Sequence, residues 1–355
     1  MELECLYYTS IQMQKRGMIM VTIKDVAKLA GVSTTTVSVV LNTAPEEKKV
    51  ALKTREKVNQ AIKAVGYQPN IAARRLRGND DVLPVIAIFW PLDYRVNFLG
   101  QVLKQIKVVV DRAYFKCELV VYPFINNELD QYREQFETET FQGAFLGALS
   151  KEDMAFLQSF ESKIPMVFYN RYLEGQHSVG SDNRMAGSLA ADLISKNGGR
   201  SVTIFQYAME EQLNSKIRLE AFVESCGKKG ITIKRWVEIP YDDKDRVVAE
   251  TELAVNEGAL GDVCLYLDEL TAYSSLFTLQ NMGIHVPDTV KLLLLNTTST
   301  SAIGSYVKPE ITRVDFDVTC MLEDCARILI HNIQQPGQKE IHKIYQPKIV
   351  YGDTF

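Results

Sequence analysis

The chain has 355 residues, of which 46% are hydrophobic and 24% are charged, and a formal net charge of −4. This length and composition exclude a fibrous or intrinsically disordered chain and leave room for one or two substantial hydrophobic cores. The charge is unevenly distributed, because residues 21–78 hold 11 Lys and Arg against 4 Asp and Glu, whereas residues 79–355 carry a net charge of −11. A basic segment on an acidic body is typical of a modular DNA-binding protein, although chance clustering on a solvated helix face would give the same count.

Residues 22–42 predict two short helices separated by a turn. In VTIKDVAKLA, Thr22 is the expected N-cap of a helix whose residues Val26, Ala27 and Ala30 share one apolar face. In GVSTTTVSVVLN, Ser33 is the expected N-cap of the second helix, since a hydroxyl side chain caps exposed backbone N–H groups better than it extends a helix. The helical spacing predicts that Val37, Val40 and Leu41 pack inward and that Thr34, Thr35, Ser38 and Val39 face outward. Two helices around a glycine-containing turn are typical of a helix-turn-helix.

A third helix and a short hinge segment follow. Residues 53–67 read as a helix with Val58, Ala61, Ile62 and Val65 on its apolar face, ended by a glycine. In the next stretch, QPNIAARRLRGNDD, Asn70 can cap a short helix rich in Ala and Arg. So few turns are not stable alone in water, and this segment is therefore expected to need a partner.

The stretches VTIKDVAKLAGVSTTTVSVVLN, TREKV and GYQPNIAARRL resemble the DNA-binding head and hinge of the lactose-repressor/galactose-repressor (LacI/GalR) family of bacterial transcription regulators. The resemblance implies a homodimer on a palindromic double-stranded operator, with the second helix in the major groove and the hinge inserting a leucine into the minor groove. The resemblance places Thr34 and Thr35 at base edges, Ser33, Thr36, Ser38 and Asn42 at phosphates, Ala73 where two hinge helices approach closely, and Leu76 as the wedge. We count the capping residues Thr22 and Asn70, and also Val39, among the expected DNA-binding residues. The resemblance also implies a domain order of residues 21–66 as helix-turn-helix head, 67–82 as hinge helix and linker, and 83–355 as effector-binding and dimerisation domain.

Two features depart from the family pattern. Where the family has an arginine in V-S-R-V-L-N, this chain has Val39, which can offer a base only methyl contact, for instance to thymine. We therefore expect an operator that differs from those typical of the family. Family heads also begin close to VTIKDV, and for this reason we expect a native start at Met18 or Met20 and a residue 1–20 extension that is either not native or disordered.

Beyond residue 82, short apolar runs alternate with amphipathic helical stretches, which predicts parallel, doubly wound sheets. Expected strands are residues 85–89, 117–122, 143–148, 166–169, 201–205, 263–267 and 291–295, and expected helices are residues 99–114, 185–197, 217–230 and 269–283. The family resemblance continues here and implies an α/β, two-lobed, periplasmic-binding-protein-like (type I) effector domain. The fold class is thus an all-α helix-turn-helix head joined to this α/β body.

Four polar residues are candidate effector contacts. By resemblance, Asn170 and Arg218 stand where family members contact the effector, and Asp268 and Asn296 are the corresponding residues after two strands of the second lobe. The carboxyl ends of parallel strands are where such sheets bind ligands. Solvated loop or cap residues would show the same pattern. Family members usually have a polar residue directly before the position of Asp268, but this chain has Leu267 there. The identity of the effector is therefore open: we expect a sugar or sugar phosphate, with a nucleobase or another metabolite as the alternative.

No feature of the sequence indicates catalysis, a metal, a cofactor or export. Cysteines and histidines are dispersed without metal-ligand spacing, and the phosphate-binding and catalytic motifs of the common enzyme classes are missing from the sequence. The first 20 residues lack a secretory apolar core, and the longest apolar run, VLPVIAIFW, is too short to cross a membrane. We expect a cytoplasmic transcription regulator, acting as a repressor and modulated by an effector, rather than an enzyme. A ligand-independent DNA-binding protein is the alternative, and a transport-type sugar-binding protein would lack the basic head.

Overall fold

The computed structural model describes residues 23–42, 50–65 and 83–355, with gaps at residues 94, 139, 160–161, 163, 208–212, 241–242 and 296–306. The chain divides into two units, residues 1–82 and 83–355. Several predictions fall outside the described residues, namely the 1–20 extension, Thr22, the hinge residues Asn70, Ala73 and Leu76, and Asn296.

The described residues of the first unit form three short helices around a small apolar core. They are α2 (Ile23–Ala30), α3 (Thr34–Asn42) and α4 (Leu52–Val65), and α2 packs on both of the others. The core consists of the inward residues that the helical spacing predicts, with Val26, Ala27, Ala30, Val37, Val40, Val58 and Ala61 all buried. The predicted three-helix head is therefore confirmed.

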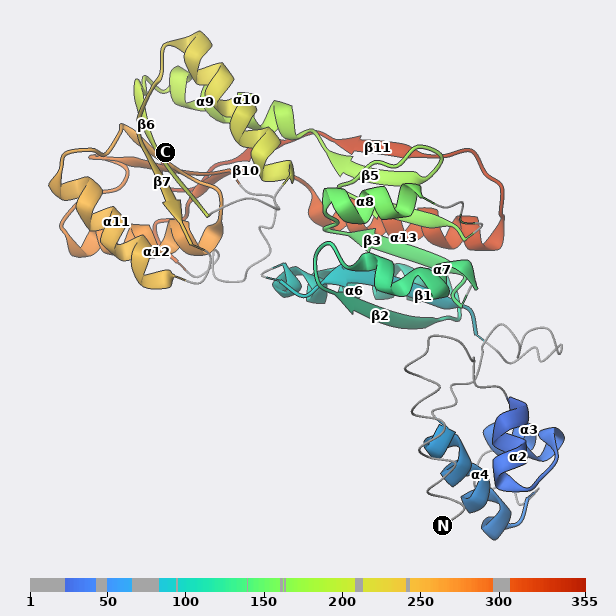
Figure 1. Ribbon diagram of the computed structural model, residues 1–355. Helices are drawn as coiled ribbons and strands as arrows, with labels where there is room; N and C mark the ends of the chain where they lie inside the picture. Colours follow the sequence, from blue (N-terminus) through green and yellow to red (C-terminus); the bar gives the residue numbers. More distant parts are fainter. Residues whose placement is uncertain are drawn as a thin grey trace. The chain divides into compact units, whose positions relative to one another are not determined.

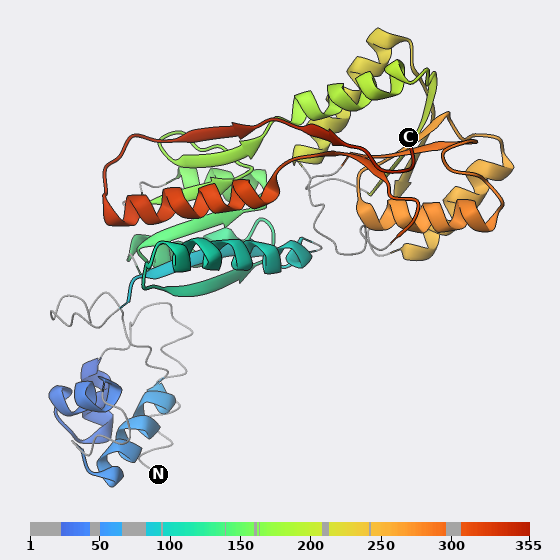
Figure 2. The same cartoon turned by 180° about the vertical axis from the view of Figure 1, so that it is seen from behind.

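The second unit is built on two six-stranded sheets (Figure 1). The first contains β1 (Val85–Pro91), β2 (Glu118–Phe124), β3 (Gly143–Gly147), β4 (Met166–Tyr169), β5 (His177–Ser181) and β11 (His342–Tyr345), in the order β11-β5-β4-β3-β1-β2 and with parallel pairing. Its helical segments are α6 (Val96–Arg112), η1 (Leu129–Tyr132), α7 (Arg133–Glu137), α8 (Lys151–Gln158) and α13 (Val318–Gln334). We call this sheet with its helices the first lobe. Seen from behind, α13 and α6 lie side by side (Figure 2).

The second lobe repeats the same topology. Its strands are β6 (Ser201–Tyr207), β7 (Thr232–Ile239), β8 (Val263–Tyr266), β9 (Lys291–Leu295), β10 (Thr312–Asp315) and β12 (Lys348–Val350), in the order β12-β10-β9-β8-β6-β7. Its helices are α9 (Asn183–Lys196), α10 (Leu213–Lys229), α11 (Lys244–Asn256) and α12 (Glu269–Asn281). Pairing is parallel except between β10 and β12. Five strands of each lobe follow the doubly wound order 2-1-3-4-5, and the predicted parallel sheets are therefore confirmed.

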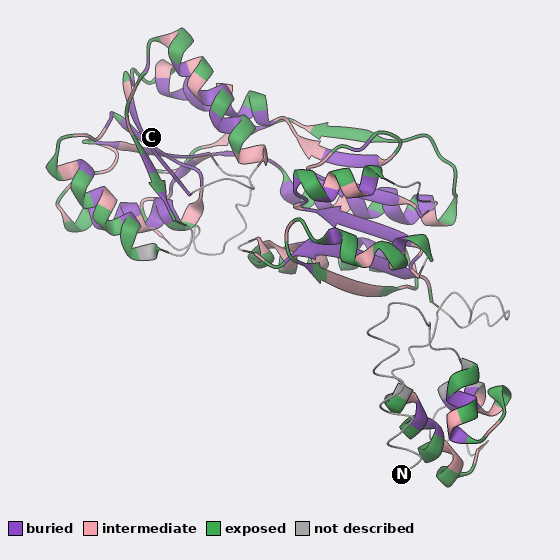
Figure 3. Ribbon diagram, in the orientation of Figure 1, coloured by how far each residue is buried: buried purple, intermediate pink, exposed green. Residues whose placement is uncertain are grey.

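The central strands of both sheets are buried between helices, whose outer faces are exposed, whereas the edge strands β7 and β11 carry exposed residues (Figure 3). In the second lobe, alternate strand residues enter different cores: Val202 and Ile204 join the cluster that includes Phe222 of α10, whereas Phe205 and Tyr207 join the cluster beneath α12. This alternation follows from the two-residue period of a strand. The identity of the helix that faces each side chain can therefore be inferred along the whole of β6.

The chain passes between the lobes at three places, before α9, before α13 and between β11 and β12. The first and third crossings are joined by a hydrogen bond of 2.9 Å from the Asp182 N–H to the Tyr345 carbonyl.

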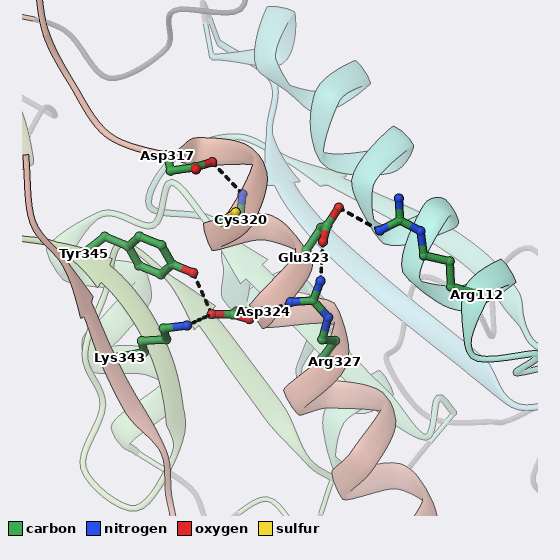
Figure 4. Close-up of polar contacts among 8 residues, drawn as sticks. All are labelled: Arg112, Asp317, Cys320, Glu323, Asp324, Arg327, Lys343 and Tyr345. Carbon is green, nitrogen blue, oxygen red and sulfur yellow. Dashed lines mark hydrogen bonds and ion pairs between the residues drawn. The ribbon is translucent and has the colours of Figure 1, made fainter. Parts of the chain in front are cut away.

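An ionic network connects α13 to β11 and α6 (Figure 4). Asp324 accepts hydrogen bonds from Lys343, Tyr345 and Arg327, while Glu323 pairs with Arg327 and Arg112. Burial raises the pKa of Asp324, but these donors outweigh burial and hold the pKa below its ordinary value.

Candidate DNA-binding surface and effector site

The turn between α2 and α3 has the geometry of a helix-turn-helix. Gly31 lies in the left-handed region at φ +65°, a conformation that glycine adopts without steric cost. The N–H of Val32 then returns to the Ala27 carbonyl at 3.0 Å. Ser33 follows, and its Oγ accepts the Thr36 N–H at 3.0 Å and lies 2.8 Å from the Thr36 Oγ1. The predicted N-cap is therefore confirmed.

The outward face of α3 carries small hydroxyls and methyls. Thr34 and Thr35 are exposed, Val39 is half-buried, and Val37 and Val40 are buried as the spacing predicts. The side chains of Ser38, Leu41 and Asn42 lie outside the described set. Helix α3 contains no charged residue, so the polar groups that it carries are backbone groups, hydroxyls and the amide of Asn42. Basic side chains come from its neighbours, where Lys24, Lys28, Lys53 and Lys57 are exposed.

Arg218 occupies the carboxyl edge of the second sheet. Its side chain comes from α10, is only 5% exposed, and donates from Nη1 to the Leu295 carbonyl at the end of β9, at 3.3 Å. Its Nε lies 3.4 Å from the Asn214 carbonyl one turn earlier. A buried guanidinium at a strand end is a fixed set of donors for hydroxyl, carboxylate or phosphate oxygens.

Close packing of α9 against α10 sets the position of this arginine. A Cβ added to Gly187 of α9 would lie 2.1 Å from the Arg218 carbonyl oxygen and 2.7 Å from the Phe222 nitrogen. Glycine is therefore required where the two helix backbones meet. The sequence pattern did not single out this position, because a helical glycine has no signature until its neighbour is known.

Asn170 lies at the edge of the first sheet and contacts both lobes. Its backbone is left-handed at φ +56°, and its Oδ1 accepts the Ser181 hydroxyl at 2.9 Å. Its carbonyl lies 3.3 Å from the Asn214 amide nitrogen of α10. Asn214 is thus a polar residue of this region that the sequence did not suggest, since no apolar strand precedes it.

Asp268 serves as the N-cap of α12. One carboxylate oxygen accepts the Thr271 N–H at 3.0 Å, and the other lies 3.1 Å from the Thr271 hydroxyl. Burial raises the pKa of Asp268, and the hydrogen bonds from Thr271 oppose that rise. The geometry fits the alternative cap interpretation of this residue, and any effector contact would be additional to it.

Aromatic rings line the corresponding edge of the first lobe. Trp90 is the last residue but one of β1, and its ring centroid lies 5.8 Å from that of Phe98. The Phe98 ring stacks on the Tyr169 ring, with 5.9 Å between the centroids. A Cβ on Gly147 would lie 2.3 Å from the Trp90 ring, so the glycine makes room for the indole. Burial raises the pKa of the Tyr169 phenol, and Arg218 and the Asn170 side chain oppose that rise. This edge offers apolar faces rather than charge.

Comparisons with known proteins agree with this architecture. Residues 22–70 match the family described as bacterial regulatory proteins, lacI family, and residues 192–355 match the periplasmic binding protein-like domain. The chain belongs to the LacI/GalR family. The HTH-type transcriptional regulator GalR of Escherichia coli is 26% identical over 340 residues, covering 93% of this chain and 94% of that protein.

Solved structures share the fold over nearly the whole chain. The Lac repressor dimer bound to operator and the anti-inducer ONPF is 19% identical with a TM-score of 0.66, covering 95% of this chain and 99% of that one. The transcriptional regulator CelR in complex with cellobiose is 20% identical with a TM-score of 0.63, covering 94% and 100%. The predicted fold class, a helix-turn-helix head with a type I periplasmic-binding-protein-like body, is confirmed. This member of the family is a DNA-binding transcription regulator, not an enzyme.

Among the described residues, no group of three or more His, Cys, Asp or Glu side chains could hold a metal ion. No helix in the described part of the chain is long and apolar enough to cross a membrane.

Proposed function

We propose that this LacI/GalR-family regulator acts in the cytoplasm as a homodimer that binds a palindromic operator and represses transcription. We further propose that a small polyhydroxylated effector, a sugar or sugar phosphate, changes its affinity for that operator. The operator-bound Lac repressor dimer and the cellobiose complex of CelR, which share the fold, support both parts of this proposal.

At the DNA, we assign Thr34 and Thr35 to base edges and Val39 to the methyl group of a thymine. Ser33, Thr36, Ser38 and Asn42 would hold phosphates, as the family resemblance implies. Ser33 and Thr36 lie at the N-terminus of α3, where hydroxyls and the helix dipole favour a phosphate. Thr22 and Asn70 would start the flanking helices, Ala73 would let two hinges approach, and Leu76 would wedge into the minor groove.

At the effector, buried Arg218 is the observation that carries the proposal. Its guanidinium is held at the carboxyl end of β9, where a doubly wound sheet binds ligands. Asn170, Asp268 and Asn296 are the other proposed contacts. Asn170 is the best supported of the three, because it reaches Asn214 across the lobes.

Coupling between the two sites follows from the hinge. Residues 67–82 are too few to be helical alone, so their folding depends on DNA and on the separation of the two heads in the dimer. An effector that favours one arrangement of the lobes shifts operator affinity by its differential affinity for the two arrangements, and by no more than that.

A thermal-shift screen of sugars, sugar phosphates and nucleobases, followed by operator binding with each hit, tests the proposal. Arg218→Ala should abolish both the thermal shift and the effector response, while operator binding without effector is retained. Arg184→Ala is the matched control, since Arg184 is an exposed arginine of the same lobe paired with Glu224. An operator response that survives in Arg218→Ala, or a hit that leaves operator binding unchanged, would refute the effector assignment. If a nucleobase stabilises the protein and changes operator binding, then the effector is a nucleobase, the alternative, and not a sugar.

A further inference from the structure

The second lobe has a topological switch point between β6 and β8. Strand β6 is the first strand of the 2-1-3-4-5 order and pairs with β7 on one side and β8 on the other. Helix α10, which follows β6, and helix α12, which follows β8, pack on opposite faces of the sheet. The carboxyl ends of two such strands are the general position of a ligand in doubly wound sheets. Gln206 and Leu267 lie at this edge: Phe205 pairs with Tyr266, and the Leu267 N–H donates to the Phe205 carbonyl at 3.3 Å.

Gln206 brings a buried and unsatisfied carbonyl to this edge. Its side chain is only 9% exposed, and its Oε1 has no hydrogen-bond partner among the residues that the structure describes. Buried side-chain oxygens in native proteins are almost always hydrogen-bonded, because an unmet acceptor retains the full cost of its desolvation. A donor supplied by a bound molecule would satisfy this oxygen.

The same side of the sheet carries Arg218. Strand alternation places Gln206 on the face of Ile204, which packs with Phe222 of α10. Leu267 of the adjacent strand and Leu295 of the next belong to the same cluster, and their side chains offer no hydrogen bond. Arg218 is bound to the carbonyl of Leu295, two strands from Gln206, a separation of about 10 Å between the strand axes. The acceptor and the guanidinium therefore flank an apolar floor formed by Leu267.

In the first lobe, the position equivalent to Gln206 is filled by a side chain whose polar atom is satisfied. Trp90 holds the same place in seven-residue β1 that Gln206 holds in seven-residue β6. The indole N–H donates to the Arg95 carbonyl at 3.0 Å, and the ring fills the space above Gly147. No polar atom of the Trp90 side chain is left over. At this strand position, the second lobe therefore has an unpartnered side-chain acceptor where the first lobe has a satisfied indole.

We propose that Gln206 is a specificity-determining residue of the effector site, whose Oε1 accepts a hydrogen bond from a ligand hydroxyl opposite Arg218. This inference rests on the proposed function and narrows it, since it requires a hydroxyl donor at the β6 end of the ligand and oxygen acceptors at the Arg218 end. A hydroxylated ring lying over Leu267 meets both requirements, because each hydroxyl can donate and accept.

The test compares the full-length protein with Gln206→Met, which nearly keeps the volume and removes the acceptor. Gln280→Met is the control, because Gln280 is an exposed glutamine of α12 in the same lobe. D-galactose, D-glucose, cellobiose and adenine are the probes, followed by calorimetric titration and by single-deoxy analogues of any sugar that binds. We expect the ligand-free Tm of Gln206→Met to equal or exceed that of the unsubstituted protein, and its sugar affinity to fall at least tenfold. One deoxy analogue should bind both proteins equally and so identify the hydroxyl.

Each other outcome overturns the inference. A Gln206→Met protein that is unfolded or has a lower ligand-free Tm would mean that the carbonyl is satisfied within the protein. Equal sugar affinity in both proteins would remove Gln206 from the site while leaving the proposed function intact. Binding of adenine alone would exclude the hydroxylated ligand, and binding of none of the probes by the unsubstituted protein would count against both the inference and the sugar effector.

Discussion

Replacement of Gly187 by alanine should move the effector arginine without touching it. The added Cβ would lie 2.1 Å from the Arg218 carbonyl oxygen, 2.7 Å from the Phe222 nitrogen and 3.1 Å from the Ala221 Cβ. The first two are backbone atoms within a helix, so no side-chain rotation relieves the contact. Helices α9 and α10 must instead separate by roughly 1 Å to restore van der Waals distances.

The free-energy change combines two opposing effects. Overpacking at a well-packed contact costs about 1–3 kcal/mol, and a clash with backbone belongs at the upper end of that range. Alanine in place of a helical glycine contributes about 1 kcal/mol in the other direction. The net destabilisation is therefore about 2 kcal/mol, which for a domain of this size class lowers the Tm by about 4–8 °C. Arg218 also shifts with α10, so effector affinity should fall even where the protein stays folded.

Thermal melts and effector titrations with a matched control measure both effects. Gly227 lies in α10 itself and has no atom within 4 Å of an added Cβ. Gly227→Ala should therefore stabilise the protein, by about 0.5–1 kcal/mol, and leave effector affinity unchanged. If Gly187→Ala is as stable as the unsubstituted protein, or binds effector with unchanged affinity, then the α9–α10 contact does not position Arg218.

Two predictions concern DNA. Val39→Arg should shift base preference within the half-site toward guanine, since a bidentate arginine contact contributes on the order of 1–3 kcal/mol of discrimination against the wrong base. Selection from random duplexes should give different sequence logos for the two proteins. Identical logos would contradict the assignment of Val39 to a base contact. Leu76→Ala should weaken operator binding much more than non-specific binding, because a wedge acts through DNA deformation, whereas Arg75→Ala should lower affinity for all sequences. Binding titrations on operator and random duplexes distinguish these results, and unchanged operator affinity in Leu76→Ala would show that the hinge does not insert.

The fold was most predictable where apolar runs are buried on both faces. All seven predicted strands are present, because central parallel strands such as β1 and β9 have no polar side to blur the pattern. Strands β5, β7, β10, β11 and β12 were not predicted. β7 alternates charged and apolar residues at a sheet edge, and β11 is mostly exposed. β11 becomes a strand by pairing with β5, more than 160 residues earlier in the chain, a contact that no local pattern encodes.

The candidate sites show the same division. The Ser33 cap could be predicted because it depends only on the four consecutive residues 33–36. Arg218 required the family resemblance, and its partner Leu295 is known only from the fold. Asp268 followed a strand and looked like a ligand contact, but the next turn of chain gives it a capping role that competes for both oxygens. The unmet carbonyl of Gln206 has no sequence signature at all, since burial and missing partners are properties of the assembled lobe.

The His177 side chain should make the body of the protein sensitive to mild acid. It is 7% exposed, and its Nδ1 accepts the Ile341 N–H at 3.0 Å beside β11. Burial lowers the pKa of His177 below 6.5, and the nearby His342 and His331 act in the same direction, whereas Asn332 and Glu340 oppose them. The unfolded chain then binds the proton more readily, so the stabilisation is complete above about pH 6.5 and is lost as the pH falls below it, by at most about 1.4 kcal/mol per pH unit. Thermal melts at about pH 7.5 and about pH 5.5 measure the stability that each protein loses in acid. This loss should be smaller for His177→Asn, which keeps an acceptor near Ile341, than for the unsubstituted protein. The control is His285→Asn at an exposed site, which should lose as much stability as the unsubstituted protein. Protonation of the His177 ring would turn its acceptor nitrogen into a donor that faces the Ile341 N–H, and this is why the folded state should lose stability in acid. Equal losses of stability in all three proteins would mean that another group causes the acid sensitivity.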